Sequence, residues 1–278
     1  YTTSMRIVAF SILFFALLFP NVAPVRAQGL PVGQEIVFSF SPQYPRPYDR
    51  VTLTISSTMF DLNGSSIKMY VNDALISENE RKATFTLGGP GTKSVVRVVA
   101  TDVDGTHEVT QTLSPADVAL IVEANSTVPP FYKGARLVAS EGPVTLIALP
   151  DFQSASGTKI PPASLVYTWK FGDKILESQS GIGKNILRAT APVRYRDARI
   201  TVTVTTQDKT MVAQGVTSVN PVDPFIRVYK NDPLGGVDFA HILSGTFAML
   251  GDEQTFRAVP YYYAAFPKIA WTLNSADS

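Results

Sequence analysis

A short segment of alternating aromatic residues constrains the fold of this chain more than any other feature. It reads Tyr-Thr-Trp-Lys-Phe-Gly-Asp-Lys from Tyr167 to Lys174, so Trp169 and Phe171 continue an alternation that Tyr167 begins. Successive side chains of a β-strand point to opposite faces, so the segment predicts a strand that sends three aromatic rings into a core. The Gly-Asp pair then predicts a tight turn into the next strand.

The same pattern occurs twice more in the chain. One copy covers residues 67–71 before Asn-Asp, and the other covers residues 269–273 before Asn-Ser. Successive copies lie about 100 residues apart, which is the size of one β-sandwich domain. We therefore predict an all-β fold of tandem antiparallel β-sandwiches. The predicted core residues of the three copies are Met69, Tyr167, Trp169, Phe171 and Trp271.

Two short joints that contain proline separate the repeats. They read Ser-Pro-Ala-Asp at residues 114–117 and Asn-Pro-Val-Asp at residues 220–223, and joints of this kind are semi-rigid. The third repeat ends shortly after its tryptophan, so we expect it to be truncated and the natural protein to continue. The predicted units are residues 1–27 (upstream residues and signal peptide), 28–115 and 116–221 (two sandwiches) and 222–278 (a truncated third sandwich).

The N-terminal segment has the three-part layout of a secretory signal peptide. A basic residue follows Met5, an apolar run covers residues 7–19, and small residues precede Gln28. We predict a signal helix that is cleaved between Ala27 and Gln28, with an uncleaved anchor as the alternative. The apolar run is shorter than the roughly 20 residues that span a bilayer as a helix, which favours cleavage.

The chain has 278 residues and no cysteine. Disulfides and thiolate sites are therefore excluded, so each sandwich must be held by packing and hydrogen bonds. A hydrophobic content of 45% is that of a globular protein. The 24 basic and 23 acidic residues give a net charge of +1, which offers no electrostatic basis for binding nucleic acid or an anionic membrane.

No segment reads as a catalytic or cofactor-binding motif. Asp102 and Asp104 open a segment that resembles a calcium loop, but it lies between two predicted strands, so a hairpin turn is the better interpretation and the two residues are weak metal candidates. The glycine-rich run at residues 88–94 lacks the Gly-Lys-Ser order of a phosphate loop and predicts a hairpin loop. His107 is predicted to be exposed on a polar strand face.

Two aromatic clusters lie outside the repeated pattern. They are Pro-Pro-Phe-Tyr at residues 129–132 and Tyr-Tyr-Tyr at residues 261–263. Exposed aromatic side chains stack on sugars or anchor protein partners, whereas buried ones fill core ends and domain joints. Both interpretations stay open here, although filling of a core end or joint is the more common outcome in a sandwich. Phe131 and Tyr261 are the residues that would test glycan binding.

The segment from Tyr167 to Lys174 resembles the signature of PKD domains, which often read Tyr-x-Trp-x-Phe-Gly-Asp-Gly. Lys174 replaces the final glycine, and the other two repeats look only generally immunoglobulin-like. The resemblance implies an exported, surface-associated bacterial protein of tandem PKD-like or immunoglobulin-like β-sandwiches. Modules of this kind generally serve as spacers or contact modules and carry no catalysis of their own.

We therefore expect a non-catalytic protein that is secreted or lies at the cell surface and acts as a stalk, adhesion or protein-interaction module. Its expected partner is an extracellular protein or a glycan, with no cofactor and no nucleic acid. Membrane contact is expected only through the N-terminal segment or a C-terminal anchor beyond Ser278. The alternative is an accessory or carbohydrate-binding region of a larger secreted hydrolase.

Overall fold

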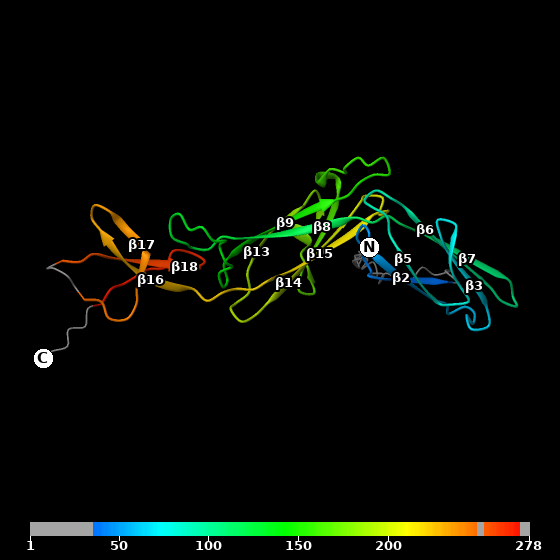
Figure 1. Cartoon of the computed structure of the whole chain (residues 1–278), viewed down its shortest axis with the longest axis horizontal. Helices are drawn as coiled ribbons and strands as arrows, with labels where there is room; N and C mark the ends of the chain where they lie inside the picture. Colours follow the sequence, from blue (N-terminus) through cyan, green and yellow to red (C-terminus); the bar gives the residue numbers. More distant parts are fainter. Residues whose placement is uncertain (1–35, 249–252, 273–278) are drawn as a thin grey trace, which may run out of the picture. The chain divides into compact units, whose positions relative to one another are not determined.

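The computed structural model describes residues 36–248 and 253–272, which form an all-β structure (Figure 1). The strands lie in five antiparallel sheets, and the helical pieces among the described residues are two 3-10 turns, Pro162–Ser164 and Glu177–Gln179. The predicted all-β, antiparallel fold is confirmed. The signal segment and its cleavage site at Ala27 and Gln28 lie outside the described residues and stay predictions.

The first sandwich packs a three-stranded sheet against a four-stranded one. The strand orders are β1-β2-β5 and β4-β3-β6-β7. Alternate residues point inward, so Leu53 of β2, Met69 of β3 and Val98 of β6 are buried in one cluster. The bounds are β1 (Val37–Ser41), β2 (Arg50–Ser56), β3 (Ser66–Val71), β4 (Ala74–Glu78), β5 (Lys82–Thr86), β6 (Ser94–Thr101) and β7 (Thr106–Leu113).

The second sandwich repeats this arrangement with one additional short strand. One sheet has the order β13-β9-β8, and the other has the order β11-β10-β14-β15 with β12 also paired to β10. The bounds are β8 (Asp117–Ala124), β9 (Pro143–Asp151), β10 (Val166–Phe171), β11 (Lys174–Ile175), β12 (Gly181–Ile182), β13 (Ile186–Thr190), β14 (Ala198–Thr205) and β15 (Val212–Val219).

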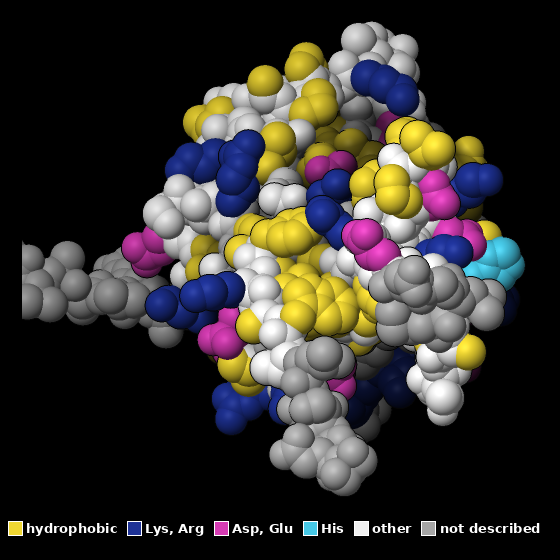
Figure 2. All heavy atoms as spheres, turned by 90° about the vertical axis from the view of Figure 1, so that its left-hand side faces the viewer, with side chains coloured by type: hydrophobic (Ala, Val, Ile, Leu, Met, Phe, Trp, Pro, Cys, Tyr) yellow, Lys and Arg dark blue, Asp and Glu magenta, His cyan; other side chains and the backbone are white. Residues whose placement is uncertain are grey.

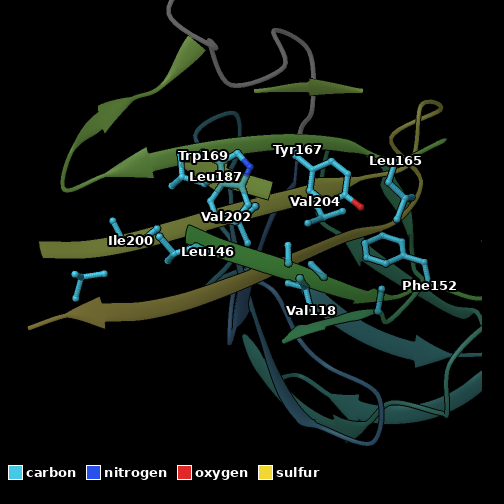
Figure 3. Close-up of a cluster of buried hydrophobic side chains, with 14 of the residues drawn as sticks. Val118, Leu146, Phe152, Leu165, Tyr167, Trp169, Leu187, Ile200, Val202 and Val204 are labelled. Carbon is cyan, nitrogen blue, oxygen red and sulfur yellow. The ribbon is translucent and has the colours of Figure 1, made fainter. Parts of the chain in front are cut away.

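Trp169 and Tyr167 are the largest side chains buried in the second core, where the labelled residues of Figure 3 converge from both sheets. The Trp169 side chain is fully buried, and its indole Nε1 donates a hydrogen bond to the Lys184 carbonyl oxygen at 2.9 Å. The Tyr167 hydroxyl donates to the Pro162 carbonyl oxygen at 3.0 Å. Each ring therefore buries a large apolar area while its polar atom keeps a partner. Phe171 is half-buried against the same core.

β3 and β10 occupy equivalent places, because each is paired with the next long strand of its sheet and followed by a two-residue turn. After β3, Asn72 and Asp73 have φ of 48° and 63°, and after β10, Gly172 has φ of 58°. A positive φ at the first turn position gives the chain the twist that paired strands need. The repeated segments at Met69 and Trp169 therefore fold alike.

The third sheet holds β16 (Phe225–Asp232), β17 (Gly236–Leu243) and β18 (Phe256–Tyr261) in the order β17-β16-β18. None of the described strands forms a second layer opposite this sheet. Its buried cluster is correspondingly small and consists of Tyr229, Val259, Tyr261 and Tyr262.

The prediction of a core strand around Trp271 is wrong for the residues that the structure describes. Residues 269–272 belong to no strand, and the Trp271 side chain is 61% exposed. A tryptophan on an alternating segment becomes buried only where a second layer covers it. The described part of the chain supplies no such layer at the third sheet, so Trp271 lies at the surface.

The two tryptophans provide a matched test of this difference. Trp169→Ala should lower the free energy of unfolding of the second sandwich by about 3–5 kcal/mol, because it leaves a cavity between two sheets and an unpaired Lys184 carbonyl. Trp271→Ala should change the free energy of unfolding of the third repeat, to which Trp271 belongs, by less than about 0.5 kcal/mol, as expected for an exposed side chain. Urea denaturation followed by far-UV circular dichroism measures both. Equal losses in the two variants would contradict the assignment.

Burial of Tyr167 makes the second sandwich sensitive to alkaline pH. Desolvation raises the pKa of Tyr167 to about 12 from a usual value of 10.0. Between these two values the unfolded chain releases the phenolic proton and the folded chain keeps it, so stability falls as the pH rises. The urea concentration at the midpoint of unfolding should be lower at pH 11 than at pH 9. This decrease should be smaller in Tyr167→Phe, which has no buried phenol. It should be as large as in the unaltered protein in Tyr48→Phe, because Tyr48 is exposed.

Candidate functional site

One face of the third sheet gathers most of its aromatic side chains. Phe225, Arg227 and Tyr229 alternate along β16, and the register with β18 places Tyr261 and Val259 beside the first two. The Phe225 and Tyr261 rings stack with centroids 4.9 Å apart. The Arg227 guanidinium lies 5.0 Å and 5.4 Å from these two rings, within the range of a cation–π interaction. We call this the aromatic face.

A segment of the second sandwich crosses to the aromatic face immediately after β8. The backbone N–H of Thr127 donates to the Tyr263 carbonyl oxygen at 2.9 Å, and the N–H of Tyr262 donates to the Thr127 carbonyl oxygen at 2.7 Å. The hydroxyls of Tyr132 and Tyr262 are hydrogen-bonded at 2.7 Å. Val128 and Tyr132 also pack against the buried cluster of the third sheet. The second sandwich and the third sheet therefore share a core at this joint.

Two further contacts hold the linker between the second sandwich and β16. The N–H of Val222 donates to the Val138 carbonyl oxygen at 2.9 Å. The Asp223 carboxylate binds Arg194 Nη1 at 3.2 Å through one oxygen and accepts from the Tyr195 hydroxyl at 3.1 Å through the other. The joint is thus clamped at two places that are distant in sequence. Thr127 and Tyr132 bond to the residues that follow β18, and the adjacent linker residues Val222 and Asp223 bond to the second sandwich.

Tyr261 and Tyr262 of the joint have raised pKa values and are strongly hydrogen-bonded. Desolvation, together with a 2.6 Å hydrogen bond to the Tyr229 hydroxyl, raises the pKa of Tyr261, and the charge of Arg227 only partly offsets this. The hydrogen bond to Tyr132 is the largest cause that raises the pKa of Tyr262, followed by desolvation. Neutral hydroxyls exchange hydrogen bonds within the cluster, so these rings are structural groups and not acids or bases near neutral pH.

A tight turn carries the one exposed aromatic of this segment. The N–H of Tyr132 donates to the Pro129 carbonyl oxygen at 3.3 Å, which closes a turn with Pro130 and Phe131 at its centre. Phe131 has φ of 59°, a conformation that a type II turn requires at its third position and that glycine normally supplies. Its side chain is 97% exposed. The chain therefore holds a phenylalanine in an unfavourable backbone conformation with its ring in solvent.

A groove of about 780 Å³ lies between this turn and the aromatic face. Seven residues of the segment 128–136 form one wall, β17 and β18 contribute Val237, Phe239 and Arg257, and Phe266 also lines the groove. The lining includes two arginines, Arg136 and Arg257, and none of its described residues is Asp or Glu. Viewed from the left-hand side of Figure 1, hydrophobic side chains gather near the centre of the surface among charged ones (Figure 2).

The Asp102–Asp104 segment forms a hairpin turn, as the sequence indicates, between β6 and β7. Asp102 Oδ1 accepts hydrogen bonds from the N–H groups of Asp104 and Gly105 at 2.9 and 3.0 Å. Desolvation raises the pKa of Asp102, but these bonds and the nearby His107 outweigh it and lower the pKa overall. No group of three His, Asp or Glu residues that could hold a metal ion occurs in the described ranges.

His107 is not exposed as predicted. It lies opposite the buried Ala100 in the β6–β7 pair, so its side chain faces the core. The His107 and Phe60 rings stack with their centroids 4.2 Å apart, and His107 Nε2 lies 3.5 Å from Asp102 Oδ1. β7 carries polar residues on both of its faces, so its sequence does not show which face packs against the core. The imidazole closes one end of the first core between an aromatic ring and a carboxylate.

The structure separates the residues of the two predicted aromatic clusters by role. Tyr132, Tyr261 and Tyr262 fill the joint, whereas Phe131 is exposed. Arg136, Phe239, Arg257 and Phe266 line the groove and carry no sequence motif. Only the long-range pairing of residue 127 with residues 262 and 263 brings them together, and a single sequence gives no signal for such a contact.

The sheets define a protein of tandem immunoglobulin-like β-sandwiches. No protein-family model and no curated protein matches the sequence. Fibronectin(III)-like modules of Clostridium thermocellum CbhA match at a TM-score of 0.30 and 15% identity, over 67% of this chain and 93% of theirs. Three N-terminal domains of the bacteriophage RB49 outer capsid protein Hoc match at a TM-score of 0.28 and 14% identity, over 81% of this chain and 68% of theirs. A fibronectin-III array of RIM-binding protein matches at a TM-score of 0.24 and 12% identity, over 71% of this chain and 74% of that array.

In the part of the chain that the structure describes, no helix has the length and apolar character needed to span a bilayer.

The conformation of Phe131 leads to a stability prediction. Phe131→Gly should keep the free energy of unfolding of the protein or raise it by up to about 1 kcal/mol, because glycine adopts the positive φ without steric cost and no packed ring is lost. Phe131→Ala should show no gain, because alanine keeps the strained backbone. Thermal melts of both variants measure this. A marked loss of stability in Phe131→Gly would mean that the ring packs against the protein.

Proposed function

We propose that this protein is a non-catalytic, exported stalk that presents a protein-interaction site at the cell surface. The observation that carries the proposal is the clamped joint between the second sandwich and the third sheet. Val222 and Asp223 fix the short proline-containing linker to the second sandwich, and Thr127 and Tyr132 of that sandwich bond to the residues that follow β18. A series of sandwiches joined in this way transmits orientation and force from one module to the next, which is what a stalk requires.

Export and the class of the modules are parts of the same proposal. The basic start and apolar run before Ala27 support secretion through a cleaved signal peptide in a bacterium. The absence of cysteine in the sequence is consistent with a protein that holds its sandwiches by packing and hydrogen bonds. We assign the second sandwich to the PKD-like class on its Tyr-Thr-Trp-Lys-Phe-Gly-Asp segment, in which Trp169 anchors the core.

A carbohydrate-binding or accessory role within a larger secreted hydrolase is the second candidate, and the exposed ring of Phe131 favours it. Tyr261, in contrast, is buried and bonded to Tyr229, so a Tyr261 variant would report on folding and not on sugar contact. Phe131 and Phe266 are the suitable positions for a sugar-stacking test.

The stiffness of the joint tests the stalk proposal directly. Because the chain has no cysteine, Lys170→Cys and Lys230→Cys place single exposed labels on β10 and β16 without competing thiols. Double electron–electron resonance between two attached spin labels should give one narrow distance distribution. Tyr132→Ala and Asp223→Ala should broaden it, because each removes a clamp.

Glu123→Ala serves as the control, since this carboxylate is exposed on β8 outside the clamps. It should leave the distribution unchanged. A broad distribution in the otherwise unaltered protein would refute a stiff stalk. A distribution that stays narrow in both clamp variants would show that these contacts do not set the stiffness.

A further inference from the structure

We propose that the groove beside the aromatic face binds an extended polypeptide of another protein in which apolar side chains alternate with carboxylates. The inference deepens the proposed protein-interaction function and rests on it. It assigns the chemistry of the partner from three features of the groove: its charge, its open strand edge and its exposed aromatic rings.

The charge of the groove selects an acidic partner. Arg136 and Arg257 line it, and the described lining contains no acidic side chain to neutralise them. Arg136 donates one hydrogen bond to Asn125, at 3.2 Å, and retains other N–H donors. Arginine binds carboxylates with two parallel hydrogen bonds, which fix orientation as well as charge. A segment with carboxylates on one side fits both guanidinium groups.

The edge of the third sheet selects an extended polypeptide. β18 is an edge strand among the described residues, and four consecutive residues of it, from Arg257 to Pro260, line the groove. An added strand would bond to this edge through its main chain and send alternate side chains to the aromatic face. Phe239 lies there with its ring 5.3 Å from that of Tyr229, so an apolar side chain of the partner would contact it.

The apolar contacts of the groove are typical of a protein-binding hot spot. Phe131 and Phe266 are 97% and 71% exposed, and Phe239 is also partly exposed. Aromatic and arginine side chains are enriched in the centre of protein interfaces. The turn places this ring at the groove, where a partner can reach it without displacing any part of the protein.

The same lining disfavours a neutral sugar. A sugar ring needs several hydrogen-bonding side chains beside an aromatic platform, whereas Asn231 is the neutral amide in this lining and most other positions are apolar. An acidic sugar shares the carboxylate but would leave the strand edge unused. Binding of an acidic oligosaccharide is therefore a separate outcome of the test.

Fluorescence anisotropy with defined probes tests the proposal on the full chain. The probes are a labelled peptide that alternates leucine or phenylalanine with glutamate, the same peptide with lysine in place of glutamate, and an oligogalacturonate. The glutamate peptide should bind, and more weakly at high ionic strength. Arg257→Ala and Arg136→Ala should each weaken binding by about tenfold or more, and Phe131→Gly should weaken it while the melting temperature is maintained.

Arg188→Ala is the matched control, because it removes an exposed arginine from β13 outside the groove, and it should leave binding unchanged. The proposal is overturned if the glutamate peptide does not bind, if the lysine peptide or the oligogalacturonate binds equally well or better, or if the groove variants bind as the control does. None of these results alters the distance distribution of the joint, so a failure here is distinct from a failure of the stalk proposal.

The accessibility of the groove is measured in the same protein. Phe266→Cys introduces the single thiol of the chain in the lining of the groove. It should react with a maleimide at the rate of Arg188→Cys, as an open groove requires. A strongly protected thiol at residue 266 would show that the chain itself occupies the groove, and this too would overturn the proposal.

Discussion

The buried indole of Trp169 is the interaction on which the second sandwich depends. The residue belongs to β10, and its Nε1 donates to the carbonyl of Lys184, which leads into β13 of the opposite sheet. One side chain therefore joins the two sheets through packing and through a part-buried hydrogen bond. In a chain without cysteine, such contacts replace the disulfide that links the two sheets of many immunoglobulin domains. Met69 fills the corresponding place in the first sandwich by packing alone.

Much of the fold is predictable because its signals are local. The alternation of residues 198–205 determines which side chains of β14 enter the core. The turns after β3 and β10 are each predictable from two residues, Asn-Asp and Gly-Asp. β4 and β17 are not predictable from local sequence, because most of their residues are exposed and neither alternates regularly between buried and exposed positions. Trp271 shows the opposite limit: the alternation is present, but burial also needs a second layer, which local sequence does not encode.

The groove could not be predicted because it depends on contacts between residues far apart in the chain. Nothing in a single sequence indicates that Phe131, after two prolines, adopts a positive φ normally left to glycine. Tyr132 and Tyr262 meet only because the segment after β8 leaves its own sandwich and pairs with residues beyond β18. Such a segment has no period, so its destination is set by tertiary packing.

The same four-residue turn connects the joint to the groove. Within it Tyr132 points inward and bonds to Tyr262, while its neighbour Phe131 points outward at the groove. A ligand that contacts both Phe131 and Arg257 bridges the second sandwich and the third sheet, and so favours the clamped arrangement over any looser one. By linkage, a clamp that holds the joint also improves the affinity of the groove, and the coupling is equal in both directions. A stalk built in this way would become stiffer at this joint when its partner is bound.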